Sequence, residues 1–292
     1  MLRSAFRNAA WTAGVVGTLF TASSAMSQEV SQSGSVLTVR GDTDRDDVTI
    51  VGTGPGNVTV TNNQGGDSED YTGVDTVQVD LRTGDDTLSI SNLDLSQGGV
   101  GLAAPNFGFV NVKLGFGEDE VFVSGTINAD ALIDGEAESD DIDLSAGVTV
   151  VGSLGVYGGL RDDEINLTGV GVGVDLLVDA QGGDDELLFS GLLVNGLASI
   201  DLGAGNDYAA GTGATFTDDA QVIAGLGDDT IENSANVYSG SLYVELRGGD
   251  DDYSELAANI AGDYSVDGGP GNDNFDDTGT IVGGTRTVNR VE

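Results

Sequence analysis

The feature that most constrains this chain is an internal repeat of 22 residues. The second acidic residue of a glycine-rich turn recurs at that spacing in six successive copies, which are Asp163, Asp185, Asp207, Asp229, Asp251 and Asp273. The residue just before it is Asp or Asn in each copy, and the residue two before is glycine in all copies but the first, where Arg161 stands. A short fixed period of this kind is typical of solenoids, in which each repeat packs on its neighbours.

The apolar residues of the repeat follow the same register. Seven residues before each Asp stand Val156, Val178, Ile200, Val222, Val244 and Val266, all β-branched. Nine residues after it stand Val172, Val194, Phe216, Tyr238, Ile260 and Val282. Apolar positions alternate around the first of these columns, as in a strand with one buried face. Three short strands and three turns in 22 residues predict an all-β fold, a right-handed parallel β-helix (β-solenoid) of about 22 residues per rung.

The chain divides into three predicted regions. Residues 1–27 have Arg3 and Arg7 before a short apolar stretch and small residues near Ala25, which predicts a signal peptide. In residues 28–110, similar turns occur at unequal spacing, so we expect an irregular N-terminal cap with early rungs. Residues 111–292 are predicted to form the regular β-helix with Gly-Asp turns. A bacterial protein that is secreted, periplasmic or on the cell surface is expected, with no transmembrane segment in the mature chain.

Composition narrows the chemistry. The 49 acidic residues against 10 basic ones give a formal charge of −39, and the chain has no histidine and no cysteine. Thiol catalysis, cysteine-based zinc sites and histidine general bases are therefore excluded. A nucleic acid would be repelled by this charge, whereas divalent cations would be attracted.

The clearest copy of the turn, Gly268–Asp276, reads GGPGNDNFD. It resembles the nonapeptide Gly-Gly-x-Gly-x-Asp-x-(large apolar)-x of the RTX (haemolysin-type) calcium-binding repeat family. That resemblance implies several calcium ions between adjacent rungs, bound by turn carbonyls and aspartates. The implied site residues are Asp86, Asp163, Asp185, Asp207, Asp229, Asp251 and Asp273, their neighbours Asp184, Asp228 and Asp250, and the glycines Gly205, Gly227, Gly249 and Gly271.

Two departures limit the resemblance. The family packs its nonapeptides in tandem, two per coil, whereas this chain has one turn per 22 residues. The family also leaves the cell by a C-terminal signal, whereas the expected signal here is N-terminal. The toxin, protease and lipase activities of that family are therefore not implied.

Electrostatics supports a cation independently of the resemblance. Rungs of a β-helix stack ~4.8 Å apart, so each column aspartate would face its counterpart in the next rung. Two unit charges at that distance repel by about 1 kcal/mol in water and by about 3.5 kcal/mol at an effective dielectric constant near 20. Calcium takes six to eight oxygen ligands, which carboxylates and turn carbonyls can supply. The alternative is that Asp and Asn simply suit turns and that monovalent salt screens their charges.

The predicted function is that of an exported calcium-binding β-solenoid with a structural, cell-surface or extracellular-matrix (adhesive) role, and not that of an enzyme. The alternative is a parallel β-helix that binds or cleaves polysaccharide. Carboxylate pairs occur throughout the chain and therefore single out no catalytic site. Arg161 and Arg247 are expected to pair with neighbouring acids. Calcium ions are the expected partners, and cell-surface polysaccharide and self-assembly are left open as further ones.

Overall fold

The computed structural model describes residues 28–96, 108–145 and 147–291. The predicted signal peptide, residues 1–27, lies outside the described residues and stays a prediction. In the part of the chain that is described, there is no helical segment with the length and hydrophobicity that a membrane crossing requires.

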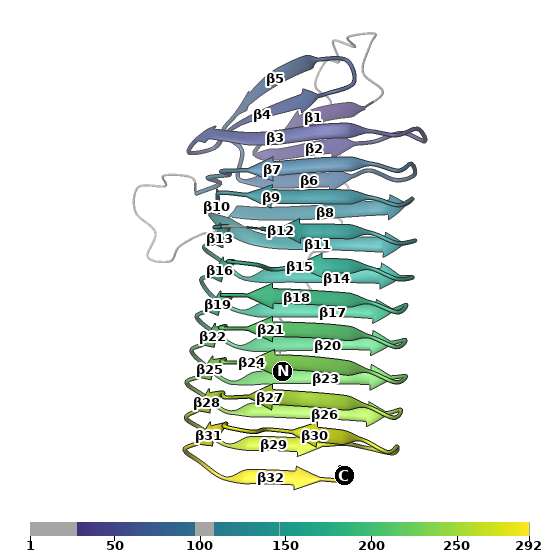
Figure 1. Ribbon diagram of the computed structural model, residues 1–292. Helices are drawn as coiled ribbons and strands as arrows, with labels where there is room; N and C mark the ends of the chain where they lie inside the picture. The colour runs from purple at the N-terminus through teal and green to yellow at the C-terminus, as the bar shows by residue number, and fades with distance from the viewer. Residues whose placement is uncertain (1–27, 97–107, 146, 292) are drawn as a thin grey trace.

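The chain forms an all-β parallel solenoid of about 8 turns, with about 22 residues per turn (Figure 1). Two sheets of twelve strands form its broad faces, and a sheet of eight two-residue strands forms a third face. The first sheet contains, in spatial order, β1 (Glu29–Ser33), β2 (Val36–Arg40), β6 (Thr76–Asp80), β8 (Gly108–Phe116), β11 (Ala129–Ala137), β14 (Leu154–Leu160), β17 (Leu176–Gly182), β20 (Ala198–Ala204), β23 (Ala220–Leu226), β26 (Leu242–Gly248), β29 (Tyr264–Asp267) and β32 (Arg286–Asn289).

The second sheet runs alongside the first. It contains β5 (Asp67–Thr72), β4 (Asn57–Asn62), β3 (Asp47–Gly54), β7 (Thr87–Ser91), β9 (Glu120–Ser124), β12 (Asp141–Leu144), β15 (Glu164–Asn166), β18 (Glu186–Ser190), β21 (Tyr208–Thr212), β24 (Thr230–Ser234), β27 (Asp252–Leu256) and β30 (Asn274–Asp276). The third, short-strand sheet contains β10 (Thr126–Ile127), β13 (Thr149–Val150), β16 (Gly171–Val172), β19 (Leu193–Val194), β22 (Thr215–Phe216), β25 (Val237–Tyr238), β28 (Asn259–Ile260) and β31 (Ile281–Val282).

The parallel pairing follows the period of the sequence. In the first sheet Val178 of β17 pairs with Ile200 of β20, and Ile200 pairs with Val222 of β23, so residues 22 apart lie side by side. The N-terminal strands differ, because β1 pairs with β2, and β3, β4 and β5 pair in sequence, in antiparallel fashion. The predicted parallel β-solenoid is confirmed, with antiparallel strands at its N-terminal end.

The interior is one continuous apolar column. The predicted inward positions are buried, with Val156, Val178 and Val244 at most 2% exposed. Large side chains from the short-strand sheet fill the later rungs, where the rings of Phe216 and Tyr238 stack at 5.0 Å. No rung could bury its apolar side chains alone, so stacking provides the hydrophobic stabilisation.

In the regular rungs from Asp185 onward, the stacking of turns requires the glycine that stands two residues before the column aspartate. Gly227 has a φ of 126°, and a Cβ at this position would lie 1.7 Å from the carbonyl oxygen of Gly205 in the preceding rung. A Cβ on Gly205 would likewise lie 1.6 Å from the carbonyl oxygen of Gly183. Only glycine allows both the positive φ and the close approach of the preceding turn.

This packing predicts the effect of adding a methyl group. We expect Gly227→Ala to lower the midpoint of thermal unfolding strongly, because the neighbouring backbone must move. Gly213 provides the control, since its φ is 63° and a Cβ there would meet nothing within 4 Å. Gly213→Ala should cost only the left-handed backbone strain of about 1–2 kcal/mol. Equal losses in the two variants, measured by circular dichroism, would contradict the steric explanation.

Candidate functional site

The column aspartates form a continuous buried ladder at the corner between the first and second sheets. All ten members are at most 3% exposed, one in each successive rung. They are Asp46, Asp86, Asp119, Asp140, Asp163, Asp185, Asp207, Asp229, Asp251 and Asp273. We call this set the inner column. The structure thus brings together all seven aspartates that the sequence placed in the column.

Nine of the ten inner carboxylates, those from Asp86 to Asp273, accept a backbone hydrogen bond from the preceding rung. The N–H of Asp163 donates to Oδ1 of Asp185, and the N–H of Asp185 donates to Oδ1 of Asp207, both at 2.8 Å. The same contact links every adjacent pair from Asp46 to Asp273. At a corner the chain leaves the sheet, so this buried N–H needs a side-chain acceptor. The first function of the ladder is therefore structural.

The second carboxylate oxygen of these aspartates, Oδ2, has a different environment. In nine of the ten inner aspartates, all except Asp46, Oδ2 is buried and has no hydrogen-bond partner. In the first rung, the N–H of Asp42 donates to Oδ2 of Asp46 at 3.0 Å. The cap thus gives Asp46 a donor that the nine later aspartates lack. A buried anionic oxygen without a donor is costly, so a positive charge or a proton is needed there.

Burial shifts the acidity of the inner column accordingly. It raises the pKa of Asp207 to about 6, that of Asp163 to about 7 and that of Asp185 to about 8. Backbone hydrogen bonds to Oδ1 oppose the shift, and the negative charges of neighbouring acids add to it. Burial raises the pKa of five further inner aspartates in the same direction, to about 7 for Asp86, 6 for Asp119, 8 for Asp140, 7 for Asp229 and 6 for Asp251.

A second column, which we call the outer column, consists of the residues one position before each inner aspartate, and it is exposed. Its hydrogen bonds run in the opposite direction, since the N–H of Asn206 donates to Oδ1 of Asp184 and the N–H of Asp228 donates to Oδ1 of Asn206. Asp250 continues this ladder, accepting from the N–H of Asn272. Asp and Asn serve equally here, because one side-chain oxygen is all that the contact requires.

The glycines of the implied site have a steric role in the structure. Gly205, Gly227, Gly249 and Gly271 each lie against the carbonyl oxygen of the glycine one rung earlier, where a Cβ would approach within 1.6–1.7 Å. The carbonyl oxygens of Gly205, Gly227 and Gly249 therefore lie against the glycine of the next rung. Within the described ranges, no group of three or more acidic side chains converges as a metal-binding cluster. A bound cation would need backbone carbonyls or water besides the aspartates.

The unequal spacing of the early turns concealed part of the ladder from sequence reasoning. Asp46, Asp119 and Asp140 occupy the same buried position as the regular copies, although they were not among the implied site residues. A third ladder, at the corner before the first sheet, was also missed. There the N–H of Leu197 donates to Asp175, that of Ser241 to Asp219 and that of Thr285 to Asp263.

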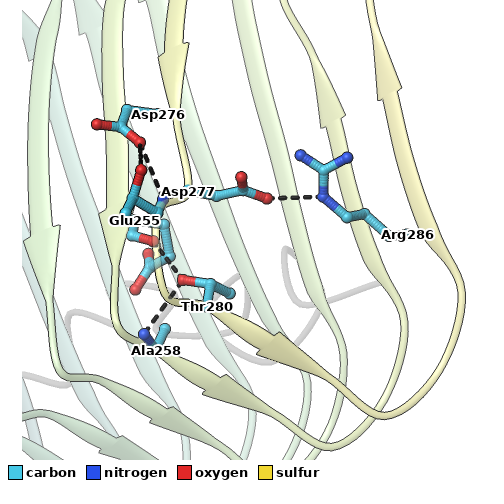
Figure 2. Close-up of polar contacts among 7 residues, drawn as sticks. Glu255, Ala258, Asp276, Asp277, Thr280 and Arg286 are labelled. Atoms are coloured by element: carbon cyan, nitrogen blue, oxygen red, sulfur yellow. Dashed lines mark hydrogen bonds and ion pairs between the residues drawn. The ribbon is translucent and has the colours of Figure 1, made fainter.

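A buried polar cluster near the C-terminal rungs was not predicted either. Glu255 is fully buried, and the hydroxyls of Tyr238 and Tyr253 donate to its Oε2 at 3.2 and 3.1 Å. Burial raises the pKa of Glu255 to about 7, against the effect of these hydrogen bonds. Its backbone carbonyl also accepts a hydrogen bond from Thr280 Oγ1, which itself accepts from the N–H of Ala258 (Figure 2). The cluster therefore ties consecutive rungs together.

Several basic residues in the described part of the chain pair with acids. Arg286 contacts Asp277 at 2.6 Å, as Figure 2 shows, and Arg290 contacts Asp267 at 2.5 Å. Arg161 and Arg247, which were expected to form such pairs, lie 3.9 Å from Glu138 and from Asp201 and Glu245, respectively. These arginines are therefore accounted for by charge pairing on the surface.

Comparison with protein-family models, with curated proteins and with solved structures yields no significant match for this chain. The resemblance to RTX repeats is thus limited to the turn. What is established is a β-solenoid with rungs of about 22 residues and a stacked ladder of buried aspartates.

The hydrogen-bond role of the ladder can be tested at Asp207. Asp207→Asn keeps an acceptor for the N–H of Asp185, whereas Asp207→Ala leaves that buried donor without one. We expect the alanine variant to be less stable than the asparagine variant by about 1–3 kcal/mol in chemical denaturation. Comparable stability of the two would show that the contact contributes nothing.

The acidity of the inner column predicts an unusual pH dependence. The eight inner carboxyls from Asp86 to Asp251 have a pKa near 4 in the unfolded chain and between about 6 and 8 in the folded one, so the folded state binds more protons between these pH values. Without bound cations, stability should therefore decrease as the pH rises from about 4 to 8. We expect the unfolding midpoint in chelator to fall by at least about 5 °C between these limits. A midpoint that rises over this window would be the opposite result.

Proposed function

We propose that this protein is an exported, calcium-stabilised β-solenoid that serves as a structural or adhesive element outside the cell rather than as an enzyme. Calcium would occupy positions along the inner aspartate column and neutralise it. The long acidic rod would then be fully stable only where millimolar calcium is present.

The observation that carries this proposal is the difference between the two columns. The outer column contains Arg45, Glu118, Ser139 and Asn206 as well as aspartates, whereas all ten inner positions are aspartate. If the inner side chain served only to accept an N–H, asparagine would serve as well. The strict use of a carboxylate indicates that the second, buried oxygen also matters. Its partner must be a cation or a proton.

The donor set suits calcium better than other common cations. The described ladder provides only oxygen, and hard oxygen ligands with flexible geometry favour calcium. Magnesium requires stricter octahedral geometry, and the chain has no histidine or cysteine for transition metals. Inner aspartates such as Asp185 and Asp229, with outer ones such as Asp184 and Asp228, would supply the carboxylates. The ion would supply charge neutralisation, and turn carbonyls and water would complete its shell.

The fold supports a structural role. The eight short strands, stacked at about 4.8 Å, alone span about 34 Å. The contacts of each rung are with its neighbours, so such a rod can present repeated surface features at fixed intervals. The N-terminal signal expected from the sequence would deliver it to a calcium-rich compartment.

Calcium titration tests the proposal directly. At pH 7.5 we expect millimolar calcium to raise the unfolding midpoint by several degrees relative to chelator, and magnesium to raise it less. One site at 100 times its Kd contributes about 2.7 kcal/mol. The double variant Asp207→Asn with Asp229→Asn should lose part of this gain without losing its fold.

Matched substitutions elsewhere provide the control. The double variant Asp218→Asn with Asp263→Asn also removes two negative charges, but from an exposed corner, and it keeps both side-chain acceptors. This variant should retain the full response to calcium. If the wild-type midpoint is identical in calcium and in chelator, the proposal is wrong and a proton is the partner of the buried oxygens.

A further inference from the structure

A column of hydroxyl groups marks another corner of the solenoid, where the second sheet meets the short-strand sheet. It lies five residues after the inner aspartates and comprises Thr168, Ser190, Thr212 and Ser234. Ser190, Thr212 and Ser234 pair in register at the ends of β18, β21 and β24. The hydroxyls of Thr212 and Ser234 lie 2.5 Å apart. The column therefore repeats one hydroxyl per rung along the axis.

These hydroxyls line a groove of ≈ 470 Å³ that crosses several rungs. This volume lies within the range of ligand-binding clefts. The small side chain of Ala210 and the apolar side chain of Leu256 also line the groove. The carboxylate of Glu232 also lines the groove, and its Oε2 is oriented by a 3.0 Å hydrogen bond from the hydroxyl of Tyr208. The groove thus combines apolar floor, hydroxyls and one oriented acceptor.

Charge determines which ligand this groove can take. Its lining contains no basic residue, and the chain carries a formal charge of −39. Anionic ligands such as uronates, phosphates and nucleic acids would therefore be repelled. The neighbouring outward column of the short-strand sheet is uncharged in all eight described rungs, with Leu193, Thr215 and Val237 at its centre. Apart from Glu232, the groove lining and this neighbouring column are uncharged, although the molecule as a whole is acidic.

We propose that this groove binds a neutral polysaccharide whose chain runs along the solenoid axis. Sugar hydroxyls would exchange hydrogen bonds with the hydroxyl column and with Glu232, while the C–H faces of the rings would pack on Ala210 and Leu256. The rung spacing of about 4.8 Å is close to the length that one pyranose unit adds to an extended chain, so successive sugars would meet equivalent groups. This proposal does not depend on which cation the aspartate ladder binds.

Native affinity electrophoresis in gels that contain calcium and a single polysaccharide tests the proposal. The panel would be hydroxyethylcellulose, xylan, galactomannan, β-1,3-glucan and dextran, with polygalacturonate as the anionic case. We expect at least one neutral polymer to retard the protein and polygalacturonate to leave it unretarded. Retardation by polygalacturonate alone, or by none of the polymers, would overturn the proposal.

Substitutions in the groove test whether these residues bind the polysaccharide. Ser190→Ala with Ser234→Ala should weaken binding to the retarding polymer by about tenfold, as expected for two lost hydrogen bonds. Ala210→Tyr, which fills the groove, should abolish retardation. Ser199→Ala with Ser265→Ala removes two hydroxyls from the outer face of the first sheet and should bind as the wild type does. Thermal unfolding in the same buffer confirms that each variant is folded, and unchanged binding by both folded groove variants would refute the site.

Discussion

The structure depends on how a β-solenoid bonds the backbone N–H groups at its corners. Within the sheets each N–H finds a carbonyl in the next rung, but at a corner the chain turns away from that pattern. Here side chains supply the missing acceptors, and the inner aspartates do so from Asp46 to Asp273. A buried N–H without an acceptor would cost about 1–3 kcal/mol in every rung. The geometry of the corners therefore explains why every rung places a side-chain acceptor at this position.

Using a carboxylate as the acceptor creates a second requirement. One carboxylate oxygen accepts a backbone hydrogen bond, while the other is buried. The negative charge of each carboxylate also lies close to the like charges of the carboxylates in neighbouring rungs. The raised pKa values of Asp140 and Asp185, about 8 in each case, express this cost. A proton or a cation removes it. The stability of the rod is thus coupled to the pH and to the cations around it.

The corners of the solenoid differ in chemistry although they repeat with the same period. The inner and outer aspartate columns make one corner acidic, and the hydroxyl column makes another neutral. Glu255 adds a buried carboxylate inside the later rungs, where tyrosine hydroxyls bond it. Because the rungs stack in register, each position of the repeat forms one column along the axis. Different corners of one solenoid can therefore differ in the contacts that they make.

The sequence by itself determined the period, the parallel stacking and the column of aspartates, because contacts between rungs join residues 22 apart and leave the same spacing in the chain. It indicated turns at Asp119 and Asp140 but did not place these aspartates among the site residues, since loops of unequal length shift their spacing. The antiparallel pairing of β3, β4 and β5 was likewise hidden, because β4 and β5 lie outside the repeat. Only the tertiary structure decided which oxygen of each aspartate is bonded and which is left without a donor. That outcome depends on the position of the neighbouring rung in space, as do the burial of Glu255 and the groove over Ala210, and no spacing along the chain encodes it.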